Sequence, residues 1–211
     1  MYRTVRYIVK QKQDRGKRGA DGRRRMQTAT PQDQSLAART RLALRRLASS
    51  VAVVTCRDGD ARHAMTATAV NAMSMDPPSM IICVNRSAAF HAAISGATHF
   101  AINILHRDQV DISVGCGGKA KGEDRFGLGV WGEDDGVPVL TDAQAHVVCA
   151  NEARFEYGSH SIFVGRVISI GMHGEIDPLI YVDGHYTCLP AGQVVASQSQ
   201  KEIEMSRQLA V

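Results

Sequence analysis

A glycine-rich stretch, residues 115–136, is the first part of the sequence whose spacing suggests chemistry. Within it, residues 127–132 match the pattern G-x-G-x-x-G. In dinucleotide-binding domains this pattern follows a strand and opens a helix whose N-terminus faces a pyrophosphate. Here it runs into Glu133-Asp134-Asp135, which would repel phosphate, and a P-loop fails because Ser113 and Ala120 stand where Gly and Ser/Thr are required. Any dinucleotide must therefore be held without a classical dinucleotide domain.

The histidines and cysteines carry no metal signature. Eight histidines are scattered, with no H-E-x-x-H motif, so we expect no metal site. Five cysteines form no C-x-x-C pair and leave one over, which is typical of a reducing compartment and favours a cytoplasmic location. Most lie in apolar segments and are expected to be buried, whereas Cys116, flanked by glycines, is expected to be the exposed one.

Residues 64–87 are the stretch around which the chain is organised. Thr66-Ala67-Thr68-Ala69 offers hydroxyls and backbone N–H groups with little side-chain bulk, so a flat polar ligand could approach the main chain. The run from Val70 to Met75 is extended, and Asp76-Pro77-Pro78 then forces a stiff turn, because proline fixes φ and lacks an N–H donor. An ordinary β-hairpin with small residues against a neighbouring sheet is the alternative.

A polar corner follows at Asn85-Arg86-Ser87, just before a short predicted helix at residues 88–95. A guanidinium, a hydroxyl and helix N-terminal amides together suit a phosphate. A solvated helix cap with an exposed arginine is the alternative. His160 stands at the tight turn Gly158-Ser159-His160 between two long extended segments, where its ring could project from a sheet edge or simply bond a nearby carbonyl.

Short strands closed by hairpin turns, with few helices, predict a mainly β, antiparallel fold of barrel type. The clearest pair is 145–157 and 161–172. We expect a helix over Ser35 to Ser49 and another over 107–114, and no periodic structure in the glycine-rich stretch. No apolar run approaches the roughly 20 residues of a membrane span.

The charge divides the chain into three parts. The net charge is +4, but the first 25 residues carry ten basic and two acidic residues, which leaves the remainder at about −4. We expect a basic, disordered extension over 1–34, a folded domain over 35–190, and a tail over 191–211 that could be helical. The extension reads as a solvated tail; nucleic-acid binding through it is an alternative.

An ordered set of motifs, spanning Arg45 to Leu189, resembles the flavin reductase family, the small NAD(P)H:flavin oxidoreductases that serve two-component monooxygenases. No single motif is decisive, but their order is specific. They are TATAVNAMSMDPP (66–78), ICVNRSA (82–88), HFAINIL (99–105), KGEDRF (121–126), YGSHSIFVGRV (157–167) and PLIYVDGHYTCL (178–189).

The resemblance implies an FMN-binding split β-barrel that forms a homodimer, with FMN or FAD as the flavin, NADH or NADPH as the reductant, and a flavin-dependent monooxygenase as the recipient. His160 would lie beside the nicotinamide, as the catalytic candidate. One departure is Ala64, where the family often has glycine. The residues expected to bind the cofactors are Thr66, Ala67, Thr68, Ala69, Asn71, Ala72, Ser74, Asn85, Arg86, Ser87, Lys121, Arg125 and Tyr186.

These residues would bind and align the two cofactors rather than act as acid or base. Hydride transfer needs two stacked rings, and the reactive chemistry belongs to the cofactors. Amides of residues 66–72 would hydrogen-bond the flavin's pyrimidine edge, Ser74 the ribityl chain, and Lys121 and Arg125 would add positive charge. Two alternatives stay open: a flavoprotein that keeps its flavin, as in oxidases resembling the pyridoxamine phosphate oxidases, and a flavin-binding module without enzymatic activity.

Overall fold

The computed structural model describes residues 31–189. The predicted basic extension, apart from residues 31–34, and the predicted C-terminal tail lie outside the described residues. None of the helices in the described part combines the length and apolar character that a membrane span requires.

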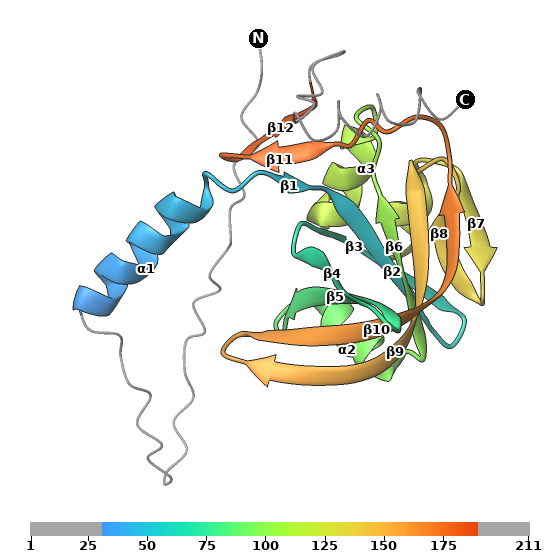
Figure 1. The fold of residues 1–211 in the computed structure, drawn as a ribbon, viewed down its shortest axis with the longest axis horizontal. Coiled ribbons are helices and arrows are strands. Elements are labelled where there is room, and N and C mark those ends of the chain that lie inside the picture. Colours follow the sequence, from blue (N-terminus) through green and yellow to red (C-terminus); the bar gives the residue numbers. More distant parts are fainter. Residues whose placement is uncertain (1–30, 190–211) are drawn as a thin grey trace, which may run out of the picture.

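A seven-stranded antiparallel sheet forms the body of the protein (Figure 1), which confirms the predicted mainly β, antiparallel class. Its strands lie in the order β3-β2-β6-β9-β10-β5-β4. Six antiparallel pairings join all seven strands in well-defined register, and small shifts occur within β4–β5 and β9–β10. The bounds are β2 Ala52–Asp58, β3 Ala61–Ala67, β4 Val70–Met75, β5 Pro78–Asn85, β6 His99–Ile104, β9 Ala145–Tyr157 and β10 His160–Met172.

The sheet curls but does not close into a barrel. Its two edge strands, β3 and β4, are consecutive in the chain and are linked by only Thr68 and Ala69. No ladder joins them; instead Ala69 O accepts a hydrogen bond from Cys83 N at 3.0 Å. The expected barrel is therefore open along one seam, with the Thr-Ala-Thr-Ala segment lying at that seam.

Smaller elements surround this sheet. Two short sheets lie beside it, one ordered β1-β11-β12 and one formed by β7 and β8, and α1 extends away from the body (Figure 1). The bounds are β1 Ser49–Ser50, β7 Trp131–Asp134, β8 Val137–Leu140, β11 Ile180–Val182, β12 His185–Thr187, α1 Pro31–Leu44, α2 Ala89–Gly96, α3 Val110–Val114, the π turn η1 Gly115–Lys119 and the 3₁₀ turn η2 Gly122–Phe126.

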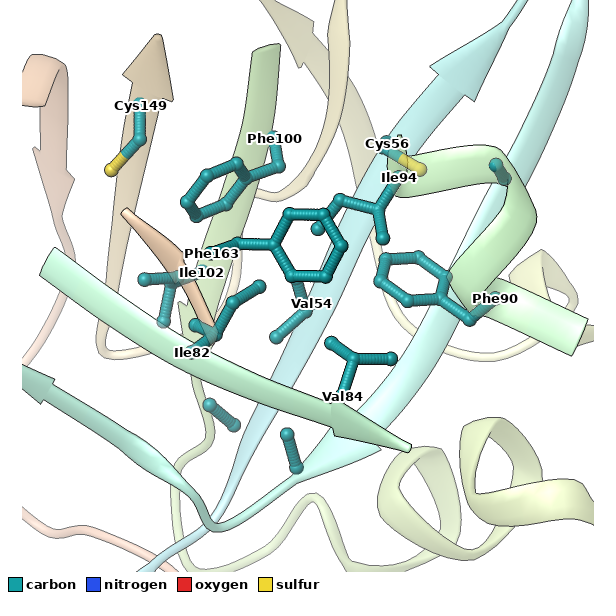
Figure 2. Close-up of a cluster of buried hydrophobic side chains, with 13 residues drawn as sticks. Val54, Cys56, Ile82, Val84, Phe90, Ile94, Phe100, Ile102, Cys149 and Phe163 are labelled. Carbon is teal, nitrogen blue, oxygen red and sulfur yellow. The ribbon is translucent and has the colours of Figure 1, made fainter. Parts of the chain in front are cut away.

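The main hydrophobic core fills the inside of the curled sheet (Figure 2). Phe100 and Phe163 meet at its centre from β6 and β10, and α2 adds Phe90 and Ile94 from one side. All four side chains are almost completely buried. Because the apolar residues of each strand alternate with residues on the outer side, this core fixes which side chains of β5 and β10 face away from it.

Several predicted boundaries differ from the structure. The first helix covers Pro31–Leu44 instead of Ser35 to Ser49. Proline is favoured in a first helical turn, and after the helix Arg45 is drawn toward the β11–β12 turn, where its Nε lies 2.6 Å from Asp183 Oδ1. The helix predicted over 107–114 begins only at Val110. The glycine-rich stretch, expected to lack structure, contains η1, η2 and β7.

The expectation for the cysteines was wrong in two respects. Cys116 is buried in a second apolar cluster, together with Val51, Ala64 and Leu105, because η1 turns its side chain inward. Cys188 is the exposed thiol.

Candidate functional site

A cavity of about 260 Å³ lies at the seam of the sheet. It is bounded by the β3–β4 junction on one side and by the β11–β12 hairpin on the other. We call it the seam pocket; its lining residues are Val51, Thr66, Ala67, Thr68, Tyr181 and Tyr186. Four of these six, namely Thr66, Ala67, Thr68 and Tyr186, are among the residues predicted from the sequence.

The main chain beside the seam pocket is that of two edge strands. Thr66 and Ala67 pair with Val53 and Ala52 of β2, and on its other side β3 has no neighbour in the sheet. An edge strand presents backbone N–H and C=O groups that a ligand can use. The side chains of residues 66–68 are small, and the Thr66 hydroxyl is turned to Ser113 O, to which it donates at 2.6 Å.

Two tyrosines form the opposite wall. Tyr181 and Tyr186 are cross-strand partners in β11–β12, and their ring centroids lie 5.3 Å apart in an edge-to-face arrangement. The Tyr186 hydroxyl lies 2.8 Å from Ser113 Oγ. Burial raises the pKa of Tyr186, and the hydrogen bond with Ser113 partly offsets this. The ring is therefore neutral at ordinary pH.

Strand β5 leads from the seam to the polar corner. Cys83 N donates to Ala69 O at 3.0 Å, and Asn85 lies two residues further along, about 7 Å away at the usual rise of a strand. Asn85 Oδ1 accepts hydrogen bonds from Ser87 N and Ser87 Oγ, both at 2.9 Å. This arrangement fixes the loop ahead of α2. The Arg86 guanidinium lies 3.1 Å from Glu156 Oε2, in an ion pair about half exposed to solvent.

His160 lies at the same corner. It is the register partner of Asn85 in the β10–β5 ladder, its side chain is exposed, and its Nδ1 lies 2.9 Å from Ser159 Oγ. Ser159 O also accepts a hydrogen bond from Arg86 N at 2.9 Å. The turn that carries His160 is thus tied to the segment Asn85-Arg86-Ser87, which the sequence could not show.

The other predicted residues are spread more widely. Asn71 and Ala72 are exposed on β4, opposite Ile81 and Met80. Ser74 lies at the far end of β4, where its hydroxyl bonds Asp76 O at 3.0 Å.

Lys121 and Arg125 differ from each other. Lys121 is exposed immediately before η2. The Arg125 guanidinium is partly buried and donates to Ala64 O at 2.5 Å and to Ala120 O at 3.2 Å, so it ties η2 to β3.

Sequence reasoning missed Val51 and Tyr181. Both lie in segments that read as ordinary strands, and nothing in their own pattern distinguishes a pocket residue from a packed one. The pairing of Tyr181 with Tyr186 across a two-residue turn, Asp183-Gly184, is the one signal that could have found Tyr181.

The geometry defines a class of protein. A curled antiparallel sheet with an open seam, an apolar and aromatic pocket at the seam, and a polar corner a few residues away suits a flat ring system with an anionic tail. The comparison with known families is specific: the family model "Flavin reductase like domain" matches residues 44–190. The chain belongs to this family.

The names of individual relatives agree with this family. The chain is 38% identical to the reductase component of an FADH(2)-dependent resorcinol hydroxylase from Rhizobium sp. (strain MTP-10005), over 72% of this chain and 87% of that protein. It is 32% identical to the FMN reductase (NADH) RutF of Methylorubrum extorquens (strain DSM 6343 / CIP 106787 / DM4), over 73% of this chain and 76% of the relative. Among solved structures, BorF, the flavin reductase component of a bacterial two-component tryptophan halogenase, superposes with a TM-score of 0.67 at 31% identity, covering 73% of this chain and 98% of BorF.

Proposed function

We propose that the protein is an NAD(P)H:flavin oxidoreductase that transfers hydride from NADH or NADPH to FMN or FAD and supplies reduced flavin to a flavin-dependent monooxygenase. The observation that carries this function is the seam pocket, whose lining combines residues 66–68 with two tyrosines, with the Asn85-Arg86-Ser87 corner close by. The relatives described above, named as reductase components and as an NADH-dependent FMN reductase, support the same reaction.

In this proposal, the residues of the chain bind the flavin and the nicotinamide and orient them. Free edges of β3 and β4 suit the polar rim of an isoalloxazine, and the tyrosine wall suits its face. The flavin, when bound, supplies the electron-accepting ring, so the protein needs no acid–base pair of its own. We assign His160 to the nicotinamide, and Arg86 and Ser87 to the flavin phosphate.

The size of the seam pocket indicates that one chain provides only part of the site. Its volume, about 260 Å³, is below the roughly 300–1,000 Å³ typical of ligand pockets. A three-ring flavin with its ribityl phosphate therefore needs a further wall, and we propose that a second copy of the chain provides it.

The face that this second copy would cover is apolar and adjoins His160. On the side of the sheet away from the main core, Cys83, Ile162 and Phe155 form one cross-strand row, and Asn85, His160 and Tyr157 form the next. Phe155 is 60% exposed and Tyr157 86% exposed. Exposed aromatic residues beside half-buried aliphatic ones are typical of an interface core. We expect Ile162→Glu to convert a homodimer into a monomer, measured by light scattering after gel filtration, and a parent protein that is monomeric would exclude the homodimer.

A cytoplasmic location is part of the proposal. All five cysteines have free thiols, as expected in a reducing compartment.

The experiment that tests the function is an oxidation assay with each nicotinamide and each flavin, together with an absorption spectrum of the purified protein. Consumption of NADH or NADPH that depends on added FMN or FAD supports a reductase with exchangeable flavin. A flavin that stays bound through gel filtration and turnover would instead indicate a flavoprotein with a prosthetic group. Flavin binding with no nicotinamide oxidation would leave only a binding module.

A further inference from the structure

Ser113 lies outside the seam pocket but is hydrogen-bonded to two lining residues on opposite sides of it. Ser113 is completely buried in α3 and does not line the cavity. Its hydroxyl lies 2.8 Å from the Tyr186 hydroxyl, and its backbone carbonyl accepts a hydrogen bond from Thr66 Oγ1 at 2.6 Å. Thr66 comes from β3 and Tyr186 from β12, so Ser113 connects the two strands that face each other across the pocket.

The bond to Ser113 decides which part of Tyr186 meets a ligand. Because the phenol hydroxyl is engaged by a residue behind the lining, the pocket is left with the aromatic ring. Tyr181 packs edge-to-face against that ring at 5.3 Å and limits its rotation from the other side. The ligand therefore meets an apolar surface here and finds its hydrogen-bonding partners on the main chain opposite.

Ser113 is itself firmly placed. Its N–H bonds Gln109 O at 3.2 Å, and the Gln109 side chain bonds His106 N at 2.9 Å and Asp142 O at 3.0 Å. After Val114 the helix continues into η1, where it is interrupted by a kink at Gly118, whose φ is 121°. The hydroxyl is thus presented from an anchored element rather than from a loop.

We propose that Ser113 is a positioning residue, which fixes Tyr186 as the aromatic wall of the flavin pocket by keeping its hydroxyl out of that pocket. This inference rests on the proposed function, since it takes the ligand of the seam pocket to be a flavin. It assigns Ser113 no contact with flavin or nicotinamide.

The physical argument predicts a distinctive pattern among substitutions. Ser113→Ala removes only the side-chain hydroxyl and keeps the carbonyl that Thr66 uses. It leaves a half-buried phenol without a partner, which is unfavourable, so the ring is released from its position. Removing both hydroxyls, by Ser113→Ala with Tyr186→Phe, leaves no unpaired group and is expected to be nearly neutral.

The test is a fluorescence titration with FMN of the parent, Ser113→Ala, Tyr186→Phe and the double variant. We expect Ser113→Ala to raise the Kd for FMN about fivefold or more, and the double variant, which has neither hydroxyl, to return to the Kd of Tyr186→Phe. Recovery by a second substitution is a result that a general loss of structure cannot give. The matched control is Ser95→Ala, a helix serine in α2 whose hydroxyl bonds His91 O and whose loss should leave the Kd unchanged.

Other outcomes overturn the inference. An unchanged Kd in Ser113→Ala, or a double variant weaker than Ser113→Ala alone, would show that Ser113 does not position Tyr186. If Ser113→Ala does not fold, Tyr186→Leu compared with Tyr186→Phe still tests the wall: the leucine variant should bind FMN about tenfold more weakly than the phenylalanine variant, and equal affinities would contradict a role for the ring. A parent that binds no FMN would instead refute the proposed function.

Discussion

Asn85 and His160 lie directly opposite each other where β5 and β10 end and begin. Because opposite residues of an antiparallel pair point to the same face, the first residue of the polar corner and the candidate nicotinamide residue share one surface. Ser159 strengthens this link, since its carbonyl accepts Arg86 N–H. The structure thus brings together two groups that lie 75 positions apart in the sequence.

His160→Ala should impair nicotinamide binding more than flavin binding. The ring is exposed and bonds only its neighbour Ser159, so its removal should not disturb the fold. We expect the KM for the better nicotinamide to rise about tenfold, the loss of one well-placed contact, with the KM for flavin changed less than twofold. The readout is steady-state kinetics with each substrate varied in turn.

His173→Ala is the matched control for this variant. His173 is exposed just beyond the opposite end of β10, so its removal should leave both KM values unchanged. An unaltered nicotinamide KM in His160→Ala would remove His160 from the site.

Replacing Arg86 and Ser87 together by alanine should weaken FMN binding through the phosphate. Charged hydrogen bonds to phosphate are worth about 1.5–3 kcal/mol, so the Kd for FMN should rise at least about tenfold. Riboflavin, which lacks the phosphate, should bind parent and variant alike. Calorimetry or fluorescence titration with both ligands separates a phosphate contact from a general effect on the pocket.

A comparable ion pair elsewhere provides the control for that experiment. Arg166 pairs with Glu152 at 2.5 Å on the same hairpin, with an exposure similar to that of Arg86 and Glu156. Arg166→Ala should leave the FMN Kd unchanged. Should Arg86→Ala/Ser87→Ala bind FMN like the parent, the phosphate lies elsewhere.

Gly165 is required for the packing of the main core. A Cβ at this position would lie 2.4 Å from Phe100 Cζ and 2.6 Å from Cys149 Cβ. Gly165→Ala should therefore reduce the free energy of unfolding by about 1–3 kcal/mol, the usual cost of overpacking, and lower the Tm by several degrees. Gly96→Ala, where no atom lies within 4 Å of the added methyl group, should change the Tm little, and equal shifts in the two variants would contradict this reading.

The long hairpin was predictable because its sequence carries its own pattern. Both strands are extended over 13 residues and meet at a glycine with positive φ, Gly158, so the predicted 145–157 and 161–172 differ from β9 and β10 by one residue at most. The glycine-rich stretch offered no such pattern. Its turns depend on tertiary contacts, such as the bonds of Arg125 to Ala64 O and Ala120 O.

The site residues, too, fall into those that the sequence predicted and those that it did not. Thr66, Ala67 and Thr68 were identifiable because they lie in the motif TATAVNAMSMDPP, which resembles the flavin reductase family, and because their side chains are small. Tyr181 and Ser113 were not, because their roles arise from the pairing of β11 with β12 and from the placement of α3 behind them. A sequence pattern reports local geometry, whereas a pocket wall is made where distant segments meet.

The thiols give a last test, on the point where sequence reasoning was wrong. Burial raises the pKa of Cys56 and Cys149 to about 12 and that of Cys116 to about 11. Since the thiolate is the reactive form, these three groups stay protonated and inert at mildly alkaline pH, and their reactivity should rise only as the pH approaches those values. Cys188 is exposed and should react first with a thiol reagent in the native protein. Cys188→Ser should remove the fast phase, whereas Cys116→Ser should leave it intact; a fast phase lost in Cys116→Ser would mean that η1 opens readily in solution and does not hold this side chain in the second apolar cluster.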